Sequence, residues 1–242
     1  MGSHICLSLC ALDACHNRLC RFKYFLERET ALQLAIDPRT IFFALEIMGV
    51  VTFALAGLFA ARAHQMDGVG TFIVTFLSAF GGGTLRDIFL EQRPFYWVEN
   101  NEILWLVLAM SVLASLTLRI SSRLLSDRVI LMADAIGLGL FSTTGTLAAM
   151  EHQWPLLPCT MVGVMAATFG GVLRDIVCNE KPQLISDRTP YASVAFAGNW
   201  VLLAVVHMGW LDYFWGAAIV GGLIAVARVW LALKGVQLPR LN

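Results

Sequence analysis

Two runs of small and charged residues repeat the same order of side chains. The first is Gly81-Gly82-Gly83-Thr84-Leu85-Arg86-Asp87, and the second is Gly170-Gly171-Val172-Leu173-Arg174-Asp175. Each glycine costs roughly 1 kcal/mol of helix propensity, so the clusters predict bends in otherwise apolar helices. A bend frees carbonyl groups, and carbonyl oxygens around a water-filled cavity are good ligands for a hard monovalent cation. The alternative is that small residues only let helices pack closely.

The Arg-Asp pair at the end of each run is the second candidate. Neighbouring residues lie about 100° apart around a helix, so Arg86 and Asp87 are not expected to satisfy each other within one ideal turn. The same holds for Arg174 and Asp175. In an inverted arrangement we expect the two arginines to approach either the aspartates of the other copy, Arg86 toward Asp175 and Arg174 toward Asp87, or the acids inside the spans, Glu46 and Asp134. The alternative is that both pairs anchor helix ends in the lipid headgroups.

Two further acids are expected inside apolar segments. Glu46 and Asp134 each lie about a turn and a half from the start of such a segment, at matched positions. An acid inside a membrane span is a functional candidate by default. Glu46 and Asp134 are expected either to attract cations or to pair with the two arginines.

The elements that carry these residues are predicted to be membrane-spanning helices. The chain is 58% hydrophobic and 14% charged, against roughly 25% charged in a soluble domain. Crossing about 30 Å takes about 20 helical residues. Charge-free stretches place seven helices near 41–61, 69–90, 103–121, 129–150, 156–178, 190–209 and 212–233. The expected fold is an all-α polytopic membrane protein with seven transmembrane helices.

An internal repeat connects the two motifs. At an ungapped offset of 88 residues, the segment Leu85-Arg86-Asp87-Ile88 aligns with Leu173-Arg174-Asp175-Ile176, and Glu46 aligns with Asp134. Three helices per copy place the second copy in the membrane upside down, as an inverted 3+3 repeat plus one extra helix. The predicted divisions are an N-terminal tail of unknown role at 1–38, a first repeat at 41–125, a second at 127–210, and the seventh helix with the C-terminal tail at 212–242.

Basic residues are unevenly shared between the two expected membrane faces. More lie in the short loops on the side of the C-terminus, so the positive-inside rule predicts a cytoplasmic C-terminus. The 17 basic and 17 acidic residues cancel, which argues against a nucleic-acid partner. We find no nucleophile-base motif, phosphate-binding loop or metal-ligand spacing, so the sequence predicts no enzyme, no cofactor and no resident metal.

The paired glycine and Arg-Asp motifs, the three-plus-three-plus-one layout and the Arg93-Pro94 and Lys181-Pro182 pairs resemble a prokaryotic member of the trimeric intracellular cation (TRIC) channel family. The resemblance spans about residues 41–234. It implies a homotrimer in the bacterial inner membrane, in contact with membrane lipids, with one pore per subunit between the kinked second and fifth helices. The pore would pass potassium and other monovalent cations such as sodium.

By this resemblance, the ion path is lined by Gly81, Gly82, Gly83, Thr84, Gly170, Gly171 and Val172, and the charged residues near it are Arg86, Asp87, Arg174, Asp175, Glu46 and Asp134. The sequence departs from the family pattern at Val172, where a third glycine would complete the second motif, and it lacks the Lys-Glu-Val motif of the animal channels. Two alternatives stay open: an alternating-access transporter of a small zwitterion such as glycine, and a structural membrane protein.

Overall fold

The computed structural model describes residues 38–116, 127–186 and 190–236. The chain divides into a first unit, Met1–Ile41, and a second unit, Phe42–Asn242. The expected tail at 1–38 therefore lies almost wholly outside the described residues. Within the described residues every regular element is a helix.

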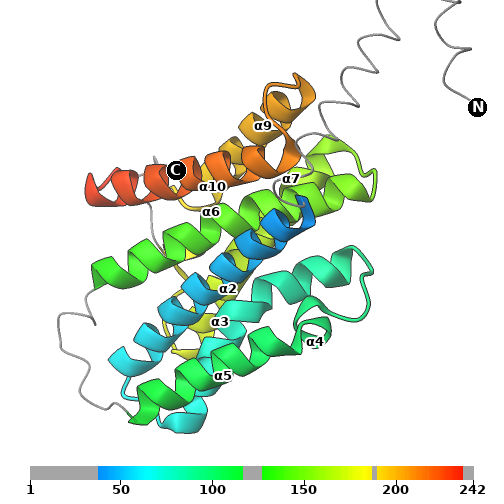
Figure 1. Cartoon of the computed structure of the whole chain (residues 1–242). Coiled ribbons are helices and arrows are strands. Elements are labelled where there is room, and N and C mark those ends of the chain that lie inside the picture. Colours follow the sequence, from blue (N-terminus) through cyan, green and yellow to red (C-terminus); the bar gives the residue numbers. More distant parts are fainter. Residues whose placement is uncertain (1–37, 117–126, 187–189, 237–242) are drawn as a thin grey trace, which may run out of the picture. The chain divides into compact units, whose positions relative to one another are not determined.

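Seven of the helices overlap the seven expected spans, and two are single turns in loops (Figure 1). Five of the seven are long and apolar enough to cross a membrane, whereas α5 and α9 are shorter apolar helices. The chain is accordingly a multi-pass helical membrane protein. The helices are α2 (Pro38–Ala63), α3 (Gly68–Phe89), α4 (Tyr96–Glu99), α5 (Asn101–Leu116), α6 (Asp127–Glu151), α7 (Leu156–Val177), α8 (Gln183–Ser186), α9 (Ala192–His207) and α10 (Tyr213–Leu233).

Local chemistry explains where the central helices begin and how they tolerate polar residues. The Asp67 carboxylate caps α3 by accepting the Gly70 N–H at 2.7 Å. Inside the bundle, buried hydroxyl groups donate to carbonyl oxygens one turn earlier, as Thr75 does to Thr71 at 2.7 Å and Thr146 to Ser142 at 2.8 Å. These bonds leave the hydroxyl groups satisfied without water.

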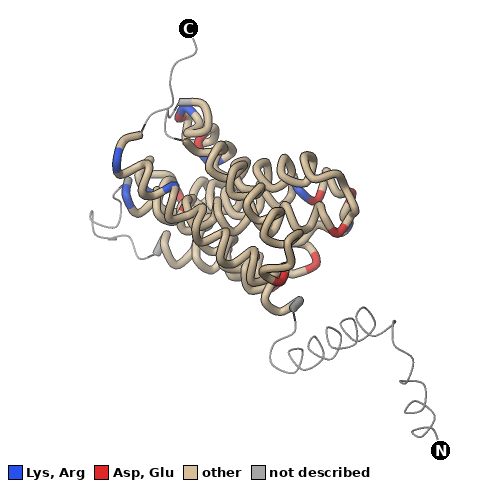
Figure 2. The backbone as a smooth tube through the Cα atoms, turned by 90° about the horizontal axis from the view of Figure 1, so that it is seen from above, with Lys and Arg blue, Asp and Glu red and all other residues tan. Residues whose placement is uncertain are grey.

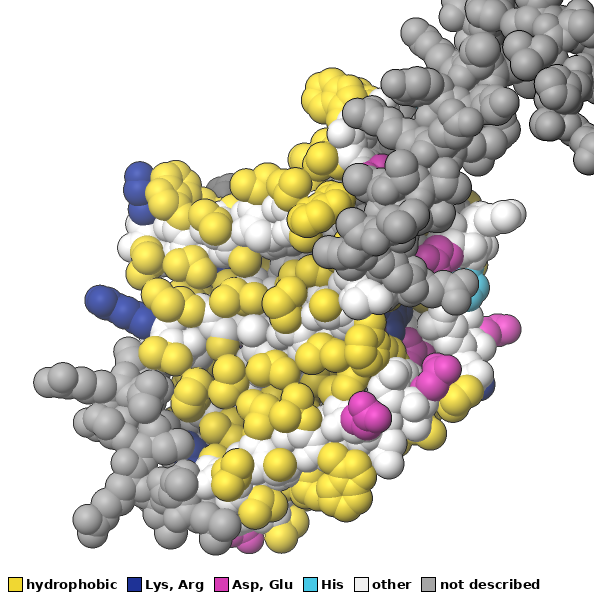
Figure 3. All heavy atoms as spheres, in the orientation of Figure 1, with side chains coloured by type: hydrophobic (Ala, Val, Ile, Leu, Met, Phe, Trp, Pro, Cys, Tyr) yellow, Lys and Arg dark blue, Asp and Glu magenta, His cyan; other side chains and the backbone are white. Residues whose placement is uncertain are grey.

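Helices α3, α6 and α7 form the centre of the second unit. Helix α7 packs against both α3 and α6, and α10 lies along α6 (Figure 1). The visible face is covered with hydrophobic side chains in its middle, while charged side chains lie near the helix ends (Figure 3). The tryptophans Trp105, Trp200 and Trp230 are exposed. A lipid-facing surface is expected to look like this.

Candidate functional site

Helices α3 and α7 touch through their backbones at the two glycine clusters. A Cβ atom added to Gly82 would stand 1.9 Å from the Ala166 carbonyl oxygen, and one added to Gly170 would stand 2.4 Å from the Ser78 carbonyl oxygen. Such distances leave no room for a side chain. These glycines are therefore required by the close approach of the two helices.

No interruption of the helix that would release carbonyl groups is found at the glycine clusters. Both α3 and α7 continue as uninterrupted α-helices through Gly81–Gly83 and Gly170–Gly171, and these glycines are buried. The physical reason is that packing against the opposite backbone offsets the poor helix propensity of glycine. The alternative of close helix packing is thus confirmed at this crossing.

The residues that follow the close contact in the first glycine motif, Gly83 and Thr84, are less tightly packed. A Cβ on Gly83 would meet only the Phe141 ring edge, at 3.6 Å, which is an ordinary contact. At the offset of 88 residues the counterpart of Gly83 is Gly171, and Val172 is the counterpart of Thr84, so this position carries a side chain in both motifs. Thr84 accepts a hydrogen bond from the Trp97 indole N–H at 3.1 Å, so it ties α3 to α4.

The first charged cluster joins α2 to the end of α3. The Arg86 guanidinium binds the Glu46 carboxylate of α2, and its Nε atom donates to Asp87 Oδ1 at 3.0 Å. All three side chains are at most 4% exposed. A guanidinium held by two carboxylates is a stable way to bury these charges, because each group keeps its hydrogen-bond partners.

The second charged cluster repeats this arrangement between α6 and α7. The Arg174 guanidinium donates to Asp134 Oδ1 at 2.8 Å through Nη1 and to Asp175 Oδ1 at 3.0 Å through Nε. These side chains are at most 5% exposed. The two arginines therefore pair with Glu46 and Asp134, which was one of the expected roles of these acids.

The expected cross-repeat pairs are wrong. Arg86 binds its own neighbour Asp87, and Arg174 binds Asp175. The arginine side chain is long enough to turn back along its helix and span the angle that separates neighbouring positions. Burial also argues against the headgroup-anchor alternative, because both guanidinium groups lie inside the protein.

Each cluster also holds the loop that follows it, a feature that side-chain spacing did not reveal. Asp87 Oδ2 accepts the backbone N–H of Tyr96, and Asp175 Oδ2 accepts that of Gln183, both at 2.9 Å. Each aspartate thus uses one oxygen for the arginine and the other for the start of a one-turn helix. The acceptor is a side chain and the donor is backbone, so no residue type in the loop marks the contact.

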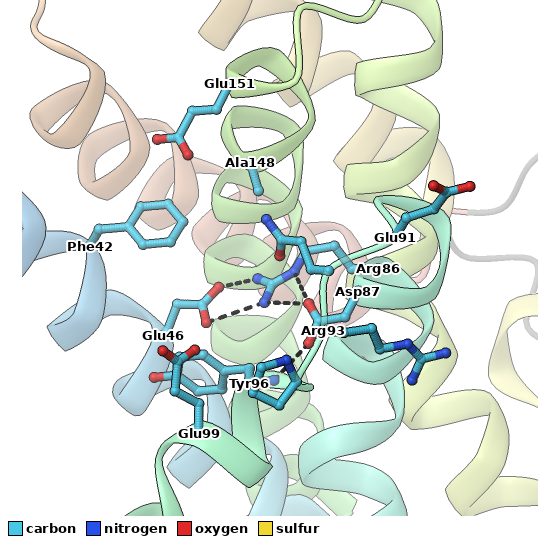
Figure 4. A pocket seen from close by; sticks show the side chains of 12 residues that line it. Phe42, Glu46, Arg86, Asp87, Glu91, Arg93, Tyr96, Glu99, Ala148 and Glu151 are labelled. Carbon is cyan, nitrogen blue, oxygen red and sulfur yellow. Dashed lines mark hydrogen bonds and ion pairs between the residues drawn. The ribbon is translucent and has the colours of Figure 1, made fainter.

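A cavity of about 430 Å³ opens beside the first cluster (Figure 4). Its lining contains five carboxylates and two guanidinium groups, so it is an electronegative mouth. Burial and the nearby Glu46 carboxylate raise the pKa of the Tyr96 hydroxyl, which therefore stays neutral at this mouth. The lining residues are Phe42, Glu46, Arg86, Asp87, Glu91, Gln92, Arg93, Pro94, Tyr96, Glu99, Ala148 and Glu151.

Contacts between the two halves of the chain come in pairs related by 88 residues. Gly82 meets Ala166 while Gly170 meets Ser78, and the same offset separates each residue from its counterpart. Likewise, a Cβ on Gly49 would touch the Phe141 ring and one on Gly137 would touch the Phe53 ring. The two phenylalanine rings lie 5.5 Å apart between their centroids.

Comparison with known proteins gives the same repeat. A family model described as "Glycine transporter" matches residues 43–119 and again residues 131–207, so both bounds shift by 88 residues. The UPF0126 membrane protein of Vibrio cholerae is 28% identical over 202 residues, covering 84% of this chain and 79% of the relative. The UPF0126 inner membrane protein YadS of Escherichia coli K12 is 30% identical over 155 residues, covering 64% and 74%.

Solved structures share the fold. The TRIC trimeric intracellular cation channel orthologue from Rhodobacter sphaeroides matches with a TM-score of 0.74 and 29% identity, over 81% of this chain and 100% of that one. A structure described for conductance through TRIC cation channels matches with a TM-score of 0.68 and 27% identity, over 82% and 96%.

Proposed function

The chain belongs to the trimeric intracellular cation channel family, and from this membership we propose that it is a passive channel for monovalent cations, potassium among them. The observation that carries the proposal is the match in fold to the Rhodobacter sphaeroides channel over the whole of that chain. We further propose a homotrimer with a pore in each subunit, because the similar solved proteins are described as trimeric channels. The proposed location is the bacterial inner membrane, because the relative YadS is described as an inner membrane protein.

We propose that the two halves form an inverted repeat of three spans each, with α10 as the extra span. The paired contacts support this arrangement. Along α3 the contact moves from Ser78 to Gly82 while along α7 it moves back from Gly170 to Ala166, as in two antiparallel helices. Helices α3 and α7 are equivalent in the repeat, and an inverted repeat requires equivalent helices to run in opposite directions.

We propose that the ion path runs between α3 and α7, with one charged cluster toward each end. The backbone contact at Gly82 and Gly170 is the proposed gate, since it closes the space between these helices. Opening requires the two helices to move apart at this contact. The residues proposed to line the open path are Gly81, Gly82, Gly83, Thr84, Gly170, Gly171 and Val172, flanked by the two clusters.

We propose that the acidic mouth faces away from the cytoplasm and that the C-terminus lies in the cytoplasm. Loops on the C-terminal side carry more basic residues, among them Arg62, Arg128, Lys181 and Lys234. Among the described residues, most of the acidic positions along the backbone lie toward one end of the bundle and most of the basic ones toward the other (Figure 2). The mouth would then gather cations from the outer side of the membrane.

Single-channel recording after reconstitution of the purified protein into planar bilayers tests the function. Unitary potassium currents of many ions per millisecond support a channel, since a carrier must change conformation for every substrate. Saturable uptake of glycine into proteoliposomes without unitary currents would instead establish the transporter that the family description names. The channel-like structural relatives favour the first outcome.

Cysteine modification tests the position of the path. In a protein without native cysteines, a cationic methanethiosulfonate reagent is expected to block currents of Val172→Cys, where the side chain is half-buried beside the proposed gate. Ile176→Cys is the matched control on the same helix, because Ile176 is 57% exposed on the apolar surface. Equal block of both variants, or of neither, would contradict the proposed path.

A further inference from the structure

An ion pair at one end of the bundle joins the two halves of the chain. The His64 Nε2 atom lies 3.0 Å from Glu180 Oε1, and the two side chains are 32% and 59% exposed. His64 belongs to the turn between α2 and α3, and Glu180 follows the end of α7. The two turns lie side by side at this end (Figure 1). The pair therefore bridges the start of α3 and the end of α7.

Both turns are fixed to their helices, so the pair has to follow any movement of α3 and α7. The backbone N–H of Met66 donates to the Ala61 carbonyl oxygen at 3.0 Å, and that of Glu180 donates to the Asp175 carbonyl oxygen at 2.8 Å. One hydrophobic cluster connects α2, α3 and the residue that ends α7, and its buried members are Ala60, Ala61, Val74 and Cys178. Separation of α3 from α7 at this end must break the contact between His64 and Glu180.

The equivalent positions at the other end of the repeat carry a different pair of residues. The offset of 88 residues places His152 opposite His64 in the alignment and Gln92 opposite Glu180. Gln92 is neutral, and the His152 Nδ1 atom lies 2.9 Å from the carbonyl oxygen of Ala148, one turn earlier in α6. Charge pairing at these two positions is therefore a property of one end of the protein.

Other ionisable groups lie on the described segments that meet at this end. Arg62 is in the last turn of α2, Asp67 caps α3, and Cys178 and Lys181 flank Glu180. The second charged cluster lies one turn back along α7. Burial raises the pKa of the Cys178 thiol to about 11. Between pH 5.5 and pH 8, an imidazole is the group in this set whose charge changes.

We infer that the contact between His64 and Glu180 is a pH-sensitive contact that stabilises the closed state of the proposed gate. The inference rests on the proposed channel function, in which α3 and α7 move apart. Protonation of the imidazole adds an attraction between opposite charges to the hydrogen bond. Acid on the side of these two turns therefore strengthens a contact that has to break when the channel opens. In the proposed orientation this side is the cytoplasm.

Open probability is therefore expected to fall when this side of the bilayer is acidified. Partly exposed ion pairs change an equilibrium by about two- to fivefold. In symmetrical KCl, the ratio of open to closed time of a single channel is expected to fall by this factor between pH 8 and pH 5.5. The size of the unitary current is expected to stay the same, because the contact changes how often the gate opens. Acid is applied to each side in turn, and a response is expected from one side only.

Three variants separate the charge from the shape of the contact. His64→Lys keeps a positive charge throughout this pH range, so its ratio is expected to stay near the native value at pH 5.5. Glu180→Gln copies the neutral residue of the equivalent position, so its ratio is expected to stay at or above the native value at pH 8. His152→Gln is the matched control, because the equivalent histidine bonds within its own helix, and it is expected to respond to acid as the native protein does.

These ratios come from single inserted channels, so a lower yield of folded variant does not change them. A native ratio that is independent of pH, an equal response from both sides, or a full response in Glu180→Gln would overturn this inference while unitary currents remain. Loss of the response in His152→Gln would overturn it as well, since the other histidine would then carry the effect. Absence of unitary currents in the native protein would instead overturn the proposed function.

Discussion

The close backbone contact predicts opposite effects for glycine substitutions at two adjacent positions, Gly82 and Gly83. In Gly82→Ala the new methyl group would stand 1.9 Å from the Ala166 carbonyl oxygen. The helices must then separate by more than 1 Å, and overpacking of this kind costs about 3 kcal/mol. Better helix propensity returns about 1 kcal/mol. The expected net loss in the free energy of unfolding is about 2 kcal/mol.

Gly83→Ala is the control, since its methyl group meets only Phe141 at 3.6 Å. Here the propensity gain of about 1 kcal/mol is expected to remain. For a chain of this size, 1 kcal/mol corresponds to about 2–4 °C in the midpoint of thermal unfolding. Gly82→Ala is therefore expected to lower the midpoint by about 4–8 °C, and Gly83→Ala to raise it by about 2–4 °C.

The assay is thermal unfolding of the purified variants in one detergent, followed by intrinsic tryptophan fluorescence at a single heating rate. The opposite signs remove effects of detergent and purification that act on both variants equally. Stabilisation by Gly82→Ala would refute the conclusion that the glycines serve helix contact. Equal destabilisation by both variants would refute the difference in available space.

Three further outcomes are expected. Arg174→Met leaves the Asp134 and Asp175 carboxylates buried without their counter-charge, so it is expected to cost about 3–5 kcal/mol, measured as a lower thermal midpoint; a midpoint equal to that of the native protein would contradict the burial of this pair. Asp67→Ala removes the cap of α3 and is expected to cost about 1 kcal/mol in the same assay, whereas an unchanged midpoint would show that the cap contributes nothing. Burial raises the pKa of the Cys178 thiol to about 11, so in a protein without the other five cysteines, alkylation is expected to speed up roughly 90-fold from pH 8 to pH 10, against roughly fourfold for a thiol of ordinary pKa. A fourfold change would contradict the burial of this thiol.

The sequence was sufficient for five of the membrane spans and for a duplication with an offset of 88 residues. Absence of charge over long stretches marks a helix in lipid, because an unpaired charge there is costly. The ungapped offset of 88 residues reappears in the paired contacts of Gly82 and Gly170. The match of Glu46 with Asp134 also identified the acids that hold the two arginines.

The local geometry at the motifs could not be predicted in the same way. A glycine cluster is compatible with both a bend and a close helix contact, and only the neighbouring backbone at Ala166 decides between them. The pairing of Arg86 with Asp87 depends on how a long side chain turns, which helix periodicity does not describe.

The pairing of charges within each half has a consequence for how the protein reaches the bilayer. Arg86 finds its counter-charges among residues of the first three-helix unit, and Arg174 finds its own in the second. The buried arginine of each half therefore finds its carboxylate partners within that half, without contacts to the other half. During synthesis, the N-terminal half can thus insert into the bilayer with its buried arginine already paired. The C-terminal half then packs against it through close contacts between helices, without forming ion pairs to it.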